Sequence, residues 1–288
     1  MTALEKYSPL LFLLMWSSGA IFVKLGLEDA SVSVFLTLRS VGAAFVLFIV
    51  CTLLSGKTGL LKRIDLPRHL LLRVIIIGMT LQVGYQSAFF LALHHDLTPG
   101  ALSILLGIQP ILTPLFAREK IGVSGYLYLL LGLSGLTIAI LGARETGAMT
   151  PLGLIFGTLS LLAISTGSVM QQKLPVDPLV SAFYQSVSAA LVFLILLPAT
   201  PLHLNLTPAF ILSAGWMILV VSSGAVLLLF HMLSKHSAST VGILFYLVPV
   251  ITLMLDYAVF GHSLSWITAA GALLVIIAIR GFSSKRAA

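Results

Sequence analysis

Residues 105–113 read LLGIQPILT, and residues 244–252 read LFYLVPVIT. The two stretches align with Pro110 on Pro249, at an offset of 139 residues. The register continues for about 30 residues beyond them, through the glycine-rich runs that follow each proline. The chain therefore contains two copies of one sequence unit.

A second pair of segments supports the duplication. Residues 38–47 read LRSVGAAFVL and residues 184–193 read YQSVSAALVF, at an offset of 146 residues. We predict two repeats, 1–146 and 147–288. Each holds an odd number of apolar spans, so the second must re-enter the membrane upside down, as in many secondary transporters.

The composition places the chain in a bilayer. Hydrophobic residues make up 59% of the sequence and charged residues 9%, with a mean hydropathy of +1.11. A soluble domain carries about 25% charged residues. The net charge of +7 does not predict a nucleic-acid partner, because the basic residues lie in short loops between apolar runs.

Ten stretches are long enough to cross a hydrocarbon core, which takes about 20 helical residues. We therefore predict an all-α integral membrane protein with ten transmembrane helices. The predicted spans are 8–26, 32–54, 70–92, 98–117, 122–142, 151–171, 178–198, 208–231, 238–260 and 263–281.

Lys and Arg predict the orientation of these spans. If the N-terminus is cytoplasmic, thirteen of the sixteen basic residues lie at or near the cytoplasmic side. The positive-inside bias then places both termini in the cytoplasm, as an even number of spans requires. We expect a multi-pass protein of the cell (inner or plasma) membrane.

Several segments resemble the EamA-type members of the drug/metabolite transporter superfamily. They are LLMWSSGAIFVKLGL in the first span, Arg39 in the second, SAFFLAL leading into LLGIQPILTPLF, and the glycine-rich fifth span. The resemblance covers nearly the whole chain and implies two inverted five-helix EamA-like repeats around a central substrate path. It also implies transport of small metabolites, usually outward. A Glu frequent in the family is replaced here by Val123 and His262, so its role is not carried over.

Arg39 is the most costly residue inside the predicted membrane. On insertion scales, the free-energy cost of placing an arginine at the centre of a membrane helix is about 2.5–3.5 kcal/mol. We therefore expect the Arg39 side chain to face a cavity or a partner. It could bind a substrate carboxylate, or it could clamp backbone carbonyls or a helix end. Its counterpart in the second copy is Gln185, which is uncharged.

The third span carries a polar stripe. Gln82, Tyr85, Gln86 and Phe89 follow helical spacing on one face, which we expect to point away from lipid. The stripe could line a substrate path or form hydrogen bonds between helices. It is not copied in the eighth span, so we expect the polar chemistry to concentrate in the first copy.

Pro110 and Pro249 lie in the middle of the fourth and ninth predicted spans. Each removes a backbone hydrogen bond and invites a kink. A static kink would suit packing, but recurrence in both copies favours two hinges beside the path. Gln109 and Tyr246 lie close to these prolines and are candidate substrate contacts.

Trp16 lies too deep in the first span for an interfacial belt, so it could stack on a substrate or pack as a buried aromatic. The adjacent histidines 94 and 95 do not form a convincing metal site. We expect no metal and no cofactor.

These features predict a secondary transporter, not an enzyme, that exports small amphipathic metabolites such as amino acids by alternating access. The candidate substrate-binding residues are Trp16, Arg39, Tyr85, Gln86, Gln109 and Tyr246. Protons are the candidate coupling ion, and the protein is expected to be a monomer or a homodimer. The alternatives are a passive, channel-like exporter and an intramembrane lipid-modifying enzyme. The enzyme is disfavoured because the acids lie at helix ends.

Overall fold

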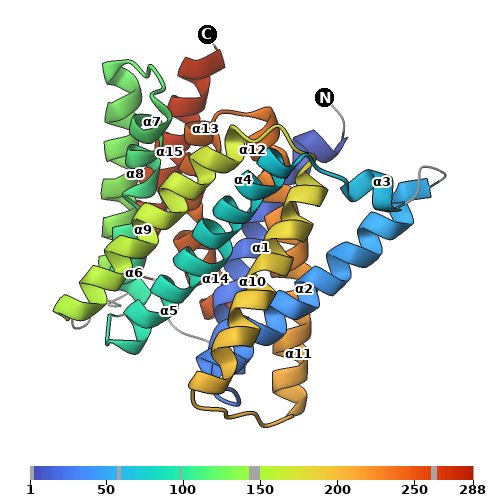
Figure 1. Ribbon diagram of the computed structural model, residues 1–288. Helices are drawn as coiled ribbons and strands as arrows, with labels where there is room; N and C mark the ends of the chain where they lie inside the picture. Colours follow the sequence, from blue (N-terminus) through green and yellow to red (C-terminus); the bar gives the residue numbers. More distant parts are fainter. Residues whose placement is uncertain (1–2, 57–59, 98, 143–149, 261–264, 288) are drawn as a thin grey trace. The chain divides into compact units, whose positions relative to one another are not determined.

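The computed structural model describes residues 3–56, 60–97, 99–142, 150–260 and 265–287, and the regular structure of this part is helical (Figure 1). Two segments are π-helices, η2 and η4, and two are short 3-10 helices, η3 and η5. In chain order the elements are α1 (Ala3–Leu27), α2 (Val32–Ser55), α3 (Leu60–Ile64), α4 (Arg68–Gly78), η2 (Met79–Gly84), α5 (Tyr85–His94), α6 (Pro99–Leu106), α7 (Gln109–Ala117), α8 (Val123–Gly142), α9 (Pro151–Gln172), α10 (Pro178–Leu196), η3 (Leu197–Ala199), α11 (Pro208–Trp216), η4 (Met217–Ala225), α12 (Val226–Lys235), α13 (Ala238–Gly242), η5 (Ile243–Tyr246), α14 (Leu247–Phe260) and α15 (Trp266–Ala287).

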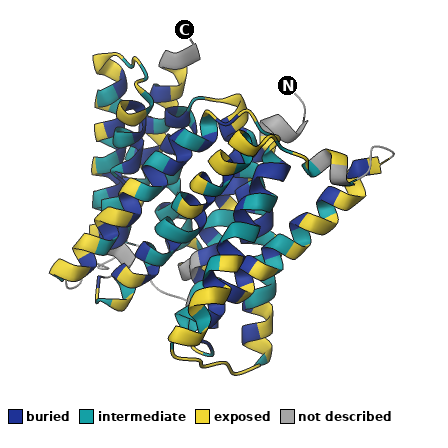
Figure 2. Ribbon diagram, viewed as in Figure 1, coloured by how far each residue is buried: buried dark blue, intermediate teal, exposed yellow. Residues whose placement is uncertain are grey.

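Within the described residues, nine helical stretches are long and apolar enough to cross a membrane. The predicted span 98–117 is covered by a shorter apolar stretch, Ala101–Ala117. Large apolar side chains are exposed along α2 and α8, including Phe45 and Leu127 (Figure 2). A helix satisfies its own backbone groups, so such faces can contact lipid without leaving polar atoms unpaired. The protein is a multi-pass membrane protein.

Proline sets where several helices begin. Pro99, Pro151, Pro178 and Pro208 are each the first residue of a helix. This position suits proline, because its missing N–H would have no partner inside the helix. Asp177 accepts hydrogen bonds from the backbone N–H groups of the two residues after Pro178, at 2.9 and 3.3 Å. The predicted span starts at Pro151, Pro178 and Pro208 are confirmed.

The chain divides into two compact units. Unit 1 comprises residues 1–83 and 170–235, and unit 2 comprises residues 84–169 and 236–288. Each unit takes helices from both predicted repeats, so packing does not follow the order of the sequence. The repeat boundary after residue 146 stays a prediction.

Unit 1 is tied together at both ends of its helices. At one end, Ala30 and Leu204 form an antiparallel bridge, and the Thr207 hydroxyl donates a 2.5 Å hydrogen bond to the Asp29 carboxylate. At the other end, the Tyr184 hydroxyl donates to the carbonyl of Ile64 at 2.8 Å. Between these ties α2 lies against α10 (Figure 1). The links join segments that are more than 100 residues apart in the chain.

In unit 2, α8 packs closely along α15 (Figure 1). Small residues allow the approach, because a Cβ added to Gly271 would lie 2.4 Å from the backbone N of Ala139 and 2.5 Å from the carbonyl O of Gly135. The Thr268 hydroxyl also donates to the Ala139 carbonyl at 3.1 Å. Close packing through small residues is a standard way to join helices in lipid.

Candidate functional site

Arg39 lies in α2 and is 9% exposed. Its Nε donates a hydrogen bond to the hydroxyl of Ser222 in η4, at 3.0 Å. Burial of a guanidinium requires such partners, since a charge without them is costly in a low-dielectric interior. The predicted counterpart of this charge in the second copy, Gln185, is also buried.

Both predicted repeats contain a π-helix in the same span of the copy. The first is η2 in the third span and the second is η4 in the eighth span. In η4 the Ser223 hydroxyl donates to the carbonyl of Ile218 at 2.7 Å. A π-helix widens the helix by an extra residue and is frequent at functional sites. The sequence pattern did not reveal either segment, because their residues have ordinary α-helical composition.

Gln185 packs on the helix that leads into η2. A Cβ added to Gly78 would lie 3.0 Å from the Cα of Gln185. The Gln185 amide nitrogen donates to Gln171 Oε1 at 2.7 Å and to the Ser181 hydroxyl at 2.9 Å. Within the described residues, its Oε1 has no hydrogen-bond partner. Arg39 and Gln185 therefore each adjoin the π-containing span of the opposite copy.

Buried polar side chains also occur in the second predicted copy. Gln171, Ser181 and Gln185 form one hydrogen-bonded cluster in unit 1. The hydroxyls of Ser165 and Ser168, in α9, are buried without a partner among the described residues. A concentration of the substrate-binding chemistry in the first copy stays a prediction.

Trp16 is half-buried in α1, with its ring centroid 5.3 Å from that of Phe12. A second tryptophan that the sequence-based prediction missed, Trp216, stacks on Phe22 at 4.8 Å and donates its indole N–H to the Ser18 hydroxyl at 2.9 Å. Both tryptophans lie in unit 1.

Tyr85 and Gln86 begin α5, directly after η2. Gln86 is buried, while Tyr85 is half-buried and its ring lies 6.0 Å from that of Phe89. The predicted polar stripe thus starts in a π-helix at Gln82 and continues in an α-helix. The chain passes from unit 1 to unit 2 within this segment, between Val83 and Gly84.

Gln109 lies at a break in the fourth span. The helix α6 ends at Leu106, a turn follows, and α7 begins at Gln109. The Gln109 side chain is 2% exposed, and its amide nitrogen has no hydrogen-bond partner among the described residues. An amide donor that is buried next to a broken helix is suited to bind a polar ligand group or an ordered water.

Pro110 and Pro249 do not interrupt continuous helices. Pro110 is the second residue of α7 and Pro249 the third residue of α14, and each follows an irregular stretch. The ninth span reaches this point through the 3-10 helix η5. Both prolines therefore occupy the first turn of a new helix, where a missing N–H is tolerated. A hinge at these breaks stays a prediction.

Tyr246 is fully buried, and its hydroxyl donates to the carbonyl of Leu129 at 2.8 Å. Its ring fills the space over Gly132, where an added Cβ would come within 2.6 Å of the ring. The structure thus gives Tyr246 a packing contact that the sequence did not predict, and a contact with substrate stays a prediction.

The histidines and acids offer no grouped ligands. Among the described residues, no three His, Cys, Asp or Glu side chains are placed to hold a metal ion. His95 stacks on Phe156 with ring centroids 5.4 Å apart. His262, which replaces the family Glu, lies outside the described residues.

The long apolar helices, with the fourth and ninth spans broken, define a polytopic membrane protein. A protein of known crystal structure has a similar fold, with a TM-score of 0.81, coverage of 96% of each chain and 19% sequence identity. No curated protein sequence matches the chain.

Residues 151–284 match the EamA-like transporter family, so this part of the chain is an EamA-like transporter domain of the drug/metabolite transporter superfamily. The family consists of membrane transporters of small molecules and not of enzymes. The resemblance noted in the sequence is therefore confirmed for the second half of the chain.

Proposed function

We propose that the protein is a secondary transporter that exports a small amphipathic metabolite, such as an amino acid, across the cell membrane by alternating access. The two halves act as inverted five-helix repeats with both termini in the cytoplasm. The substrate path is lined by residues from both repeats, and protons are the candidate coupling ion.

One observation carries the proposal: the same spans are irregular in both predicted copies. The third and eighth spans contain π-helices, and the fourth and ninth spans are broken ahead of a proline. Discontinuous helices at corresponding places of two repeats are typical of the substrate sites of secondary transporters. A passive channel needs no such paired irregularity, which favours the transporter over the channel.

The proposed site assigns a separate role to each candidate. Arg39 supplies positive charge for an anionic group, and the amides of Gln86 and Gln109 supply hydrogen bonds. Trp16 and Tyr85 offer aromatic surface to the apolar part of the substrate, and Tyr246 supports the broken ninth span from inside the packing. Substrate binding would then bias an equilibrium between two conformations that exchange by bending near Pro110 and Pro249.

Counterflow in proteoliposomes tests the proposal. Purified protein is reconstituted with a panel of unlabelled amino acids and related metabolites inside, and uptake of the labelled compound is followed. A transporter accumulates label transiently and saturably, whereas an open pore does not. Uptake should fall sharply in Arg39→Ala and Gln86→Ala, while Gln172→Ala, on the half-exposed side of α9, should match the wild type. Equal uptake in all four proteins would remove Arg39 and Gln86 from the site.

A further inference from the structure

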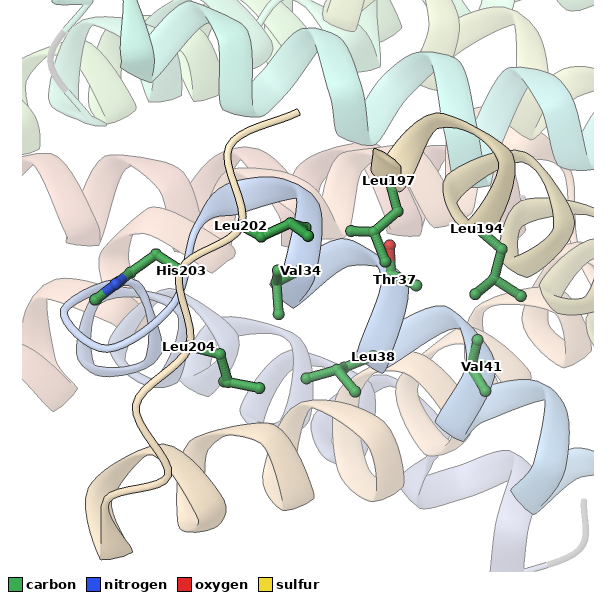
Figure 3. Close-up of a pocket in the computed structure, with 9 residues that line it drawn as sticks. All are labelled: Val34, Thr37, Leu38, Val41, Leu194, Leu197, Leu202, His203 and Leu204. Carbon is green, nitrogen blue, oxygen red and sulfur yellow. The ribbon is translucent and has the colours of Figure 1, made fainter. Parts of the chain in front are cut away.

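A shallow groove runs along the surface of unit 1 between α2, the end of α10 and the extended segment 201–206 (Figure 3). Its volume is about 500 Å³. Leu38 and Leu204 point toward each other across it (Figure 3). The lining residues are Val34, Thr37, Leu38, Val41, Leu194, Leu197, Leu202, His203 and Leu204.

The wall of the groove offers almost no hydrogen-bonding capacity. The hydroxyl of Thr37 already donates to the carbonyl of Ser33 in its own helix at 2.7 Å. The backbone carbonyl of His203 accepts from the N–H of Ser31 at 2.9 Å. Among the side chains that line the groove, the other polar group is the His203 ring, whose Nε2 lies 3.5 Å from the Asn205 amide nitrogen. An occupant must therefore be apolar over most of its length.

The segment 201–206 presents leucines to one side. It is held extended by the bridge between Leu204 and Ala30, and the N–H of Asn205 donates to the carbonyl of Asp29 at 2.7 Å. Side chains alternate along extended backbone, so Leu202, Leu204 and Leu206 share a face. They are 66%, 42% and 71% exposed, which is unusual for three leucines of a loop unless the loop lies against lipid.

The groove continues the lipid-facing surface of two spans. Leu38 and Val41 of α2 and Leu194 of α10 line it and are exposed. Further along the same helices, Phe45 and Leu191 are exposed as well. The groove is thus the end of a continuous apolar strip on two membrane-spanning helices, and the bilayer is what covers this strip.

We propose that this groove is a binding site for one acyl chain of a bilayer phospholipid. The lipid belongs to the leaflet on the side of the α10–α11 connection. Its chain lies between Leu38 and Leu204, and its polar head lies beside the ring of His203 and the amide of Asn205. A volume of about 500 Å³ is within the ~300–1,000 Å³ typical of ligand sites, so the groove has room for a bound chain. The site does not depend on the transport function.

Native mass spectrometry of the full chain in detergent tests this, with a 3:1 mixture of palmitoyl-oleoyl phosphatidylethanolamine and phosphatidylglycerol added back to delipidated protein. The wild type should retain one phospholipid. Leu38→Trp, which fills the groove, should lose it. Leu53→Trp, on the same helix at 76% exposure and outside the groove, should keep it. Equal retention in both variants would overturn the proposal.

A second measurement distinguishes the chain from the head group and does not rely on the folding of the tryptophan variant. Added lysophospholipid, which has one acyl chain, should displace the retained lipid, whereas glycerophosphoethanolamine, which has none, should not. Leu204→Ser, a change in an exposed loop residue, should weaken retention in the same assay. Displacement by the head group alone, or retention unaffected by Leu204→Ser, would also refute an acyl-chain site.

Discussion

The guanidinium Nε of Arg39 lies 3.0 Å from the hydroxyl of Ser222, across 183 residues of sequence. The acceptor belongs to the π-helix η4 of the eighth predicted span, so the buried charge of α2 is bonded to an irregular helix far along the chain. This contact links the residue proposed to attract an anionic group to a π-helix.

Removal of the Ser222 hydroxyl should destabilise the protein without removing the charge. A hydrogen bond to a charged group contributes about 1.5–3 kcal/mol, so Ser222→Ala should lower the melting temperature in detergent. Arg39→Lys keeps the charge but loses the planar donor array, and should retain part of the transport that Arg39→Ala loses. A Ser222→Ala protein that is as stable as the wild type would show that the bond contributes nothing.

The glutamine pair Gln171 and Gln185 should behave as a coupled unit. Replacement of Gln171 by Leu leaves the Gln185 amide with one partner fewer, at a cost of about 1–3 kcal/mol. The double variant Gln171→Leu/Gln185→Leu should cost less than the sum of the single changes, by about 0.5–3 kcal/mol. Chemical denaturation of the four proteins measures the coupling. Gln172→Leu, one residue further, is the control and should stay within about 0.5 kcal/mol of wild type.

Gly271→Ala should disrupt the packing of α8 on α15. The added methyl group would lie 2.4 Å from a backbone nitrogen, which cannot move aside as a side chain can. Overpacking of this kind costs about 1–3 kcal/mol. Gly215→Ala in α11 has no atom within 4 Å of the new Cβ and should be neutral or stabilising by up to about 1 kcal/mol. Similar melting temperatures for the two variants would contradict the close contact.

Tyr246→Phe separates packing from substrate contact. It removes only the hydroxyl that donates to Leu129, and such bonds within membranes contribute about 0.6 kcal/mol and at most about 1.7. We expect a small loss of stability and an unchanged KM for transport. A raised KM with an unchanged melting temperature would instead assign the hydroxyl to the substrate.

Pro110→Ala tests the hinge. Alanine restores an N–H at the second residue of α7 and favours a continuous fourth span, so turnover should fall while substrate still binds and raises the melting temperature. Pro114→Ala in the interior of the same helix is the matched control, because it does not adjoin the break. If both variants transport at the wild-type rate, bending at Pro110 is not part of the cycle.

The spans of the fold were predictable to within a few residues, while the irregularities inside them were not. Pro151, Pro178 and Pro208 mark helix starts in the sequence itself, because the covalent geometry of proline favours the first turn of a helix. No comparable local signal marks η2 or η4. The break before Pro110 was expected as a kink, but the sequence could not show that the proline begins a separate helix.

For the candidate site, the sequence predicted which types of residue are buried better than it predicted their hydrogen-bond partners. Arg39, Gln86 and Gln109 are buried, as polar groups in apolar spans should be. The partner of Arg39 and the cluster around Gln171 were missed, because a lone serine or glutamine in an apolar run has the same local pattern whether it faces lipid or another helix.

The amino-acid sequence alone determined that this chain spans a membrane and where most of its helices begin, because hydropathy and proline geometry are properties of the chain itself. Only the tertiary structure decided that helices of both halves pack into each compact unit and that Arg39 bonds to Ser222. In lipid, apolarity does not choose partners, since lipid tails are as apolar as leucine side chains. Small residues, buried amides and hydroxyls determine which helices pack together, and their effect depends on which helix faces lie together.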